Sequence, residues 1–385
     1  MVIGLGYCLL ASTLSMPAAL PEVRRTIRMS DTVTSLHGSF FGWGLVLASL
    51  FGSGLILRLG RQRTMIAAVV AMGLGAGTFA TGTTVIQTLI GAAFAGLGAS
   101  ALVIVVPGLV ADAFGHRRTE VFNKVNVAPG LAGFSFPLAV AGAPLIGLNW
   151  RWPSACIPLL FLVAIAIVCR PLLGVRTGVA PLATARARDV LRPLRRNPYV
   201  RKRFLLQVLQ VMLEYSLVVW QVTYLREHVG FTRSLAPLGA AAGAFGIVTS
   251  RTLVPRLIAS FGRQLESICF ATFGVASLTL LFTQNRVVAI GAIAFAAFAI
   301  GPTYTLTVER MFLRSSSPTL ITSSLSGVAS GVAISIGPLL VGTLSDRFGL
   351  RTALFSLPLG AVFGLYLCLT RWGHEAGSLG QRVTA

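Results

Sequence analysis

Two apolar runs joined by a short basic turn occupy residues 36–82. The first run, 36–57, reads LHGSFFGWGLVLASLFGSGLIL, the turn at 58–63 reads RLGRQR, and the second run, 64–82, reads TMIAAVVAMGLGAGTFATG. An α-helix rises about 1.5 Å per residue and the hydrocarbon core of a bilayer is about 30 Å thick. Each run is therefore long enough to cross a membrane, and the stretch predicts a helical hairpin in lipid.

Comparable runs continue along all 385 residues, of which 55% are hydrophobic and 11% charged, with a mean hydropathy of +0.80. Soluble proteins are about one quarter charged, so this chain is expected to fold in lipid. The pattern predicts an all-α polytopic membrane protein with twelve transmembrane helices. We expect these helices near residues 2–20, 36–57, 64–82, 86–111, 122–147, 153–170, 204–226, 235–257, 266–283, 287–309, 319–343 and 352–370.

The net charge of +21 does not indicate nucleic-acid binding, because the basic residues lie mainly in short gaps between apolar runs. With both termini in the cytoplasm, 23 of the 32 lysines and arginines fall inside and nine outside. This bias obeys the positive-inside rule and predicts a multi-pass protein of the cell membrane, a bacterial inner membrane. The basic stretch Arg24-Arg25-x-x-Arg28 is an exception, because this topology places it outside.

The polar segment from residue 170 to 203 divides the chain nearly in half. It contains ten basic residues and one acid, Asp189, so we interpret it as a cytoplasmic linker whose basic residues meet anionic membrane lipids. The expected divisions are an N-terminal six-helix half, a basic linker, a C-terminal six-helix half and a cytoplasmic tail, at 1–170, 171–203, 204–371 and 372–385.

Three short patterns occur twice, in the same order and about 200 residues apart. They are Leu59-Gly60-Arg61-Gln62 with Phe261-Gly262-Arg263-Gln264, Asp112 before Arg117 with Glu309 before Arg314, and Ala143-Pro144-Leu145-Ile146 with Gly337-Pro338-Leu339-Leu340. Three repeats in register predict two parallel six-helix units related by internal pseudo-symmetry.

The stretch Ser53–Arg63 resembles the loop signature of the major facilitator superfamily, G-x-L-a-D-r-x-G-r-r. Arg58, Gly60 and Arg61 match its basic and glycine positions, whereas Leu57 replaces its acid. The resemblance implies a twelve-helix carrier fold. In this family the signature acid helps to close the cytoplasmic gate. Here Asp112 could replace it by meeting the basic turn at 58–63, and Glu309 by meeting the equivalent second basic turn around Arg263. Alternatively, both acids are ordinary charges at helix ends.

The resemblance also implies roles for other positions. The expected gating residues are Arg58, Gly60, Arg61, Asp112, Gly262, Arg263 and Glu309. The prolines expected to bend helices are Pro144, Pro302 and Pro338. The family's antiporters carry a glycine-rich fifth helix, which Gly130, Ala139 and Ala143-Pro144 match only in part. The helix-four arginine of its drug antiporters is Ala92 here.

Glu214 is the eleventh of 23 residues in the predicted seventh span. A carboxyl at that depth is costly and marks a functional site by default, although a protonated structural carboxyl is the alternative. Polar residues at helical spacing share its face and are expected to line a central cavity: Gln207, Gln210, Gln221 and Tyr224. Glu214 could bind a proton or a cationic substrate. Tyr304, on the tenth span, is a further candidate. Arg251 is expected to extend toward the cytoplasmic surface, and binding of an anionic group is the alternative.

These features favour a secondary active transporter of small organic molecules, working by alternating access. Proton-coupled export, an efflux antiporter of amphipathic or cationic compounds, is the preferred hypothesis. Import or facilitated diffusion of a metabolite and a non-transporting membrane sensor remain alternatives. No catalytic or metal-binding motif occurs, the five cysteines fall in apolar runs without metal-ligand spacing, and no enzyme activity or cofactor is expected. We expect a monomer.

Overall fold

The computed structural model describes residues 2–114, 133–169, 187–315 and 317–370. Within these ranges the chain is helical and contains no strand. The side chains of Arg61 and Asp112 lie outside the described part.

The described part of the first half consists of long and short apolar helices. Its elements are α1 (Val2–Leu14), η1 (Met16–Ala19), α2 (Leu20–Ile27), α3 (Asp31–Thr81), α4 (Val85–Phe114), a helical stretch at 133–142, η3 (Ala143–Ile146) and α6 (Arg151–Cys169). The predicted first span is therefore broken, because a 3-10 segment containing Pro17 follows α1. The two predicted spans at 36–57 and 64–82 together form α3.

The second half follows a short amphipathic helix. Its elements are α7 (Ala187–Arg196), α8 (Pro198–Glu227), α9 (Pro237–Phe261), η5 (Gly262–Gln264), α10 (Leu265–Phe282), α11 (Arg286–Arg314), α12 (Thr319–Phe348), α13 (Leu350–Ala353) and α14 (Ser356–Leu369). Helix α8 begins six residues before the predicted span, because the Asn197 side chain caps its N-terminus and Pro198 occupies its first position. The predicted end of the linker at residue 203 consequently lies inside α8.

Eight helices in the described ranges are long and apolar enough to cross a membrane, and one of these, Pro237–Phe282, contains the α9–α10 break. Two shorter apolar helices, Gly133–Ile146 and Arg151–Ala166, accompany them. The helical membrane fold predicted from the sequence is thus confirmed, whereas the count of twelve spans stays a prediction.

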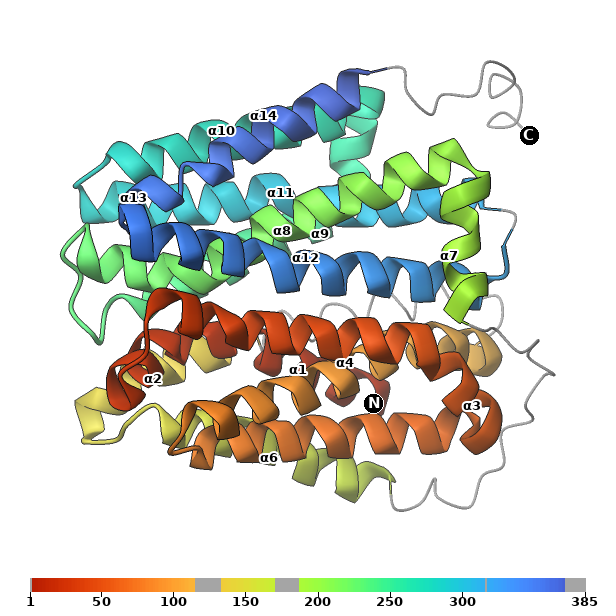
Figure 1. Cartoon of the computed structure of the whole chain (residues 1–385), viewed down its shortest axis with the longest axis horizontal. Helices are drawn as coiled ribbons and strands as arrows, with labels where there is room; N and C mark the ends of the chain where they lie inside the picture. Colours follow the sequence, from red (N-terminus) through yellow and green to blue (C-terminus); the bar gives the residue numbers. More distant parts are fainter. Residues whose placement is uncertain (1, 115–132, 170–186, 316, 371–385) are drawn as a thin grey trace.

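Figure 1 shows the helices of the first half, coloured red to yellow, beneath those of the second half, coloured green to blue. Helices α3 and α12 lie side by side across the junction and make the most extensive contact between the halves. Ser39 and Ser335 exchange hydrogen bonds there, with Oγ–O distances of 2.7 and 3.2 Å. Small and hydroxyl side chains therefore allow two long helices to meet along their length.

Gly60 and Gly262, which occupy equivalent repeat positions, both interrupt their helices with positive φ. Gly60 has φ 78° inside α3, and Gly262 has φ 50° between α9 and α10. Only glycine adopts such angles without strain, so the paired motif marks the same reversal in each half. The proline pair differs locally, because Pro144 starts a 3-10 turn whereas Pro338 lies within continuous α12.

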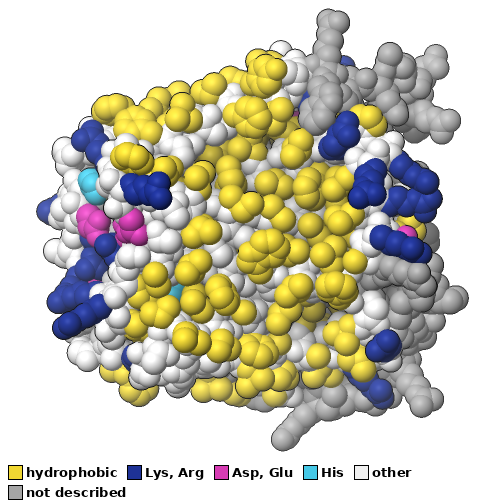
Figure 2. All heavy atoms as spheres, viewed as in Figure 1, with side chains coloured by type: hydrophobic (Ala, Val, Ile, Leu, Met, Phe, Trp, Pro, Cys, Tyr) yellow, Lys and Arg dark blue, Asp and Glu magenta, His cyan; other side chains and the backbone are white. Residues whose placement is uncertain are grey.

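The outer surface has the distribution of side chains expected for lipid contact. Figure 2 shows a broad hydrophobic band between two ends where lysines and arginines gather. Large apolar side chains are strongly exposed in both halves; Phe51 is 62%, Leu160 66% and Val275 64% exposed. Such a surface has no stable arrangement in water, so the bilayer is the solvent of the folded chain.

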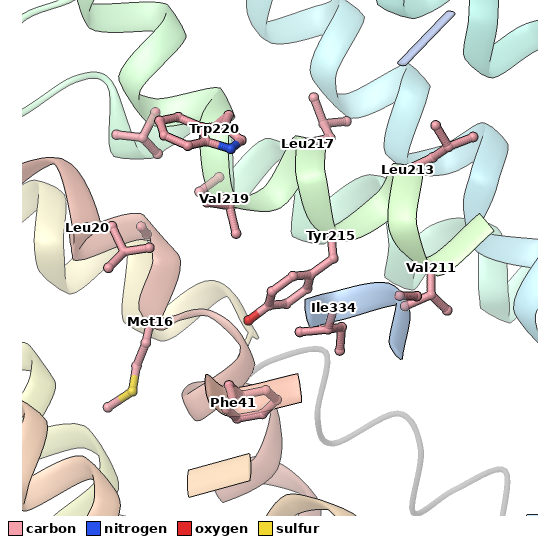
Figure 3. Packing of buried hydrophobic residues seen from close by; sticks show 14 of the residues in the cluster. Met16, Leu20, Phe41, Val211, Leu213, Tyr215, Leu217, Val219, Trp220 and Ile334 are labelled. Carbon is pink, nitrogen blue, oxygen red and sulfur yellow. The ribbon is translucent and has the colours of Figure 1, made fainter. Parts of the chain in front are cut away.

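The buried core crosses the junction between the halves. Figure 3 shows Tyr215 of α8 directed toward the first half, with Phe41 and Met16 on that side and Ile334 of α12 nearby. Trp220, which is fully buried, donates its indole N–H to the Pro338 carbonyl at 3.2 Å. Apolar packing and a few fixed hydrogen bonds thus hold α8 against α12.

Candidate functional site

Glu214 forms an ion pair inside the second half. Its Oε1 lies 3.2 Å from Nη2 of Arg251, which comes from α9. The Glu214 side chain is 16% exposed and that of Arg251 is 41% exposed. Of the two alternatives for Arg251, the structure shows the pairing with an anionic group, because the partly buried Glu214 carboxylate gives its guanidinium a charge-assisted partner.

Tyr304 completes this group from a third helix, α11. The guanidinium carbon of Arg251 lies 5.6 Å from the centre of the Tyr304 ring, within range of a cation–π interaction. Helices α8, α9 and α11 thus bring an acid, a base and a tyrosine ring together. The sequence suggested these three residues separately, and the structure places Arg251 between the other two.

Gln207 and Gln210 are directed into helix contacts of the second half. Gln207 donates through Nε2 to the Ser326 carbonyl at 2.9 Å and to its hydroxyl at 2.7 Å, on α12. Gln210 accepts from Thr303 Oγ1 of α11 at 3.0 Å. Both glutamines are fully buried. Their common helical face therefore does not give them a common cavity, because neighbouring helices cover successive parts of that face.

Gln221 and Tyr224 are likewise buried within the second half. Gln221 lies against Gly243 of α9, and the Tyr224 hydroxyl donates to the Leu281 carbonyl of α10 at 3.2 Å. Three glutamine atoms nevertheless lack a hydrogen-bond partner among the described residues: Gln207 Oε1, Gln210 Nε2 and Gln221 Oε1. Unpaired buried polar atoms are costly, so these positions stay candidates for contact with water or a ligand.

The expected gating residues are only partly described. Arg58, Arg263 and Glu309 are exposed, and Glu309 forms no ion pair with another described residue. The predicted meeting of Glu309 with the second basic turn is thus not observed. The predicted meeting of Asp112 with Arg58 or Arg61 involves the Asp112 side chain, which lies outside the described part. Among the bending prolines, Pro302 lies within continuous α11, as Pro338 does in α12.

A buried cluster that the sequence analysis missed joins three helices of the second half. Glu266 of α10 accepts two hydrogen bonds from Nη1 of Arg203, at 2.7 and 3.0 Å, and pairs with Arg310 at 2.5 Å. Thr307 donates to the same carboxylate at 3.3 Å. The predicted linker includes Arg203. This residue lies inside α8 because the helix begins at Pro198, six residues before the predicted span. The cluster ties the starts of α8 and α10 to the end of α11.

Ion pairs also join the two halves at the end of the molecule formed by α2 and α13, hereafter the α2 end (left in Figure 1). Arg226 Nη1 lies 2.7 Å from Glu22 Oε1, and Arg24 Nη1 lies 3.1 Å from Glu227 Oε1. In addition, the Asp346 carboxylate of α12 accepts from the backbone N–H groups of Asp31 and Thr32 at 2.9 Å each. Asp346 thereby caps α3 of the opposite half.

Comparison with known proteins agrees with this architecture. A bacterial homologue of the human lysosomal transporter Spinster, inward-facing and unoccupied, has a TM-score of 0.73 and 16% identity, over 95% of each chain. The xylose transporter XylE from E. coli, in a partially occluded inward open conformation, has a TM-score of 0.71 and 16% identity, over 95% of this chain and 96% of that one. A D-xylose–proton symporter has a TM-score of 0.73 and 16% identity over 96% of each chain.

At this identity the structural matches establish the fold. No curated protein matches the chain in sequence. The fold, with two helical halves and an apolar belt, defines a polytopic membrane protein. The sequence model of the Major Facilitator Superfamily matches residues 1–320, and the chain belongs to that family. The family resemblance inferred from residues 53–63 is thereby confirmed.

Proposed function

We propose that the chain is a proton-coupled secondary transporter of small organic molecules, in which Glu214 carries the proton. The observation that supports this function is the ion pair between Glu214 and Arg251. It lies within the helices of a transporter fold, beside an aromatic residue of α11. Ionisable groups at such positions are costly and usually belong to ion or substrate pathways.

The pair gives the site two chemical states. With Glu214 ionised, its carboxylate neutralises Arg251. Once Glu214 is protonated, the guanidinium loses that partner and becomes available to another acceptor. Because each state leaves a different group unpaired, proton binding and substrate binding at this site are energetically linked. Alternating access then turns this linkage into transport coupled to the proton gradient.

Export remains the proposed direction, supported by the partial match of the fifth helix to an antiporter pattern, and import of a metabolite is the alternative. The pairing of Glu214 with Arg251 removes the argument that a free carboxylate selects a cation. The substrate of this proposal is therefore a small organic molecule without a required positive charge.

The test uses a transport-deficient bacterial host grown on a panel of toxic amphiphiles, with wild type and variants at matched expression. Glu214→Gln and Arg251→Gln should each abolish protection as completely as a protonophore does. The double variant Glu214→Gln/Arg251→Gln removes both charges, so no charge is left without its partner. It should therefore be as stable as wild type, but it should not regain proton-coupled transport.

Protection by Glu214→Gln that remains sensitive to the protonophore would contradict the assignment of Glu214. If wild type protects against no compound, uptake of metabolites into proteoliposomes under an imposed pH gradient should then be measured. Wild-type protein that moves no solute in either assay would contradict the transport proposal and favour a sensor.

A further inference from the structure

A cavity of about 620 Å³ opens at the α2 end, between the two halves. Five arginines line it: Arg24, Arg25, Arg28, Arg226 and Arg233. A single carboxylate, Glu227, shares the lining with them. Small-molecule sites typically have volumes of about 300–1,000 Å³, so the cavity has the size of a ligand site. Figure 2 shows basic side chains gathered at this end, next to a few acidic ones.

Ion pairs account for two of these arginines. Arg24 contacts both Asp31, at 2.8 Å, and Glu227, and Arg226 contacts Glu22. The other three arginines have no carboxylate within ion-pairing distance among the described residues. The cavity therefore keeps a positive charge that the described residues do not neutralise. Arg24, Arg25 and Arg28 form the basic stretch that departs from the positive-inside rule.

The uncompensated arginines come from both halves. Arg25 lies on α2, and Arg28 ends that helix in the left-handed conformation, with φ 58°. Arg233 follows α8 in the second half. A non-glycine residue with positive φ is uncommon and carries a conformational cost, so the chain accepts strain where it places this side chain. A ligand in the cavity can thus be held from two sides.

We propose that this cavity binds a small organic anion with two or more acidic groups and that the bound anion holds the α2 end closed. Guanidinium groups bind carboxylate and phosphate oxygens through paired, charge-assisted hydrogen bonds. An anion with two acidic groups reaches Arg25 or Arg28 on one side and Arg233 on the other. Separation of the halves at this end would divide the arginines, so the ligand stabilises the arrangement that forms the cavity.

The test measures citrate binding by titration calorimetry, with the full chain in nanodiscs of zwitterionic lipid at fixed ionic strength. Arg25→Gln/Arg28→Gln/Arg233→Gln removes the unpaired arginines and keeps every inter-half ion pair. The matched control, Arg192→Gln/Arg195→Gln/Arg196→Gln, removes the same charge from exposed positions of α7. The cavity variant should bind citrate at least about tenfold more weakly than wild type, because one charge-assisted bond contributes about that factor. The control should bind as wild type does.

Three further results decide the proposal. Citrate should raise the melting temperature of wild type and the control, but not of the cavity variant. Equal weakening in both variants would overturn the proposal, because bulk charge alone would then explain binding. Loss of citrate binding in discs that contain phosphatidylglycerol would also overturn it, because a lipid head group would then be the occupant.

Discussion

At the scale of single residues, two carboxylates of the second half, the buried Glu266 and the partly buried Glu214, have different surroundings. Glu214 has one partner, Arg251, which is itself partly exposed, whereas Glu266 has two arginines and a threonine around it. The groups around Glu266 come from α8 and α11, so its carboxylate joins three helices. Glu214 is bound to one side chain that solvent can reach. The difference assigns a structural role to Glu266 and supports the transport role proposed for Glu214.

Glu266→Gln should lower stability strongly without removing any apolar contact. The substitution leaves Arg203, whose side chain is 8% exposed, buried without a counter-charge. Breaking a buried pair by removal of one partner costs about 3–5 kcal/mol. The measurement is the melting temperature in detergent, followed with a thiol-reactive dye as the buried Cys8 and Cys269 become accessible. Glu309→Gln, on an exposed side chain of α11, should change the melting temperature little. Equal melting temperatures for the two variants would contradict the structural role of Glu266.

At the scale of secondary-structure elements, the contact between α3 and α12 requires glycine, which has no side chain, where the two helices meet. A Cβ atom on Gly42 would lie 2.5 Å from the Gly331 carbonyl and would also overlap the Ser335 side chain. Backbones of membrane helices approach this closely only where the side chains are small. Glycine at this position therefore sets the separation of the halves, and the serine hydrogen bonds depend on that separation.

Gly42→Ala should separate α3 from α12 and lower the melting temperature. Gly54→Ala is the matched control, because a Cβ there meets no atom within 4 Å and alanine favours the helix by up to about 1 kcal/mol. The control should melt at or slightly above the wild-type temperature. Two variants that melt alike would show that the close approach at Gly42 does not limit stability.

At the scale of the whole molecule, the halves are joined at the α2 end by charged and capping contacts. Asp346 caps α3 across the junction, while Ser30 of the first half accepts a hydrogen bond from the Val33 N–H of the same helix. Helix α3 therefore keeps a local cap if Asp346 is lost. Removal of the inter-half contact should change the balance of conformations and leave the fold intact.

Asp346→Asn should increase the population in which the α2 end is open. The measurement is the distance between spin labels at Thr83 of the first half and Gln284 of the second, two exposed positions at this end. Longer distances are expected for the variant. The asparagine side chain has one acceptor oxygen instead of two for the N–H groups of Asp31 and Thr32, and it lacks the negative charge that the N-terminus of α3 favours. Arg347→Gln, at the exposed neighbouring position, should leave the distance distribution unchanged. An unchanged distribution in Asp346→Asn as well would contradict a role in closure.

The sequence by itself determined the helical membrane fold and the positions of most helices, because apolar runs of spanning length are a local property. It also located Gly60 and Gly262 through the repeated motif, and both have the positive φ that glycine adopts without strain. The family followed from the motif around that first turn.

Only the tertiary structure decided which residues meet. Helical spacing placed Gln207, Gln210 and Glu214 on one face, but it did not indicate that α12, α11 and α9 respectively cover them. The partner of Glu214 lies 37 residues away on another helix, and the arginine cavity combines segments about 200 residues apart. The physical reason is that hydropathy fixes which side of a helix avoids lipid, whereas the neighbour on that side depends on how whole helices pack.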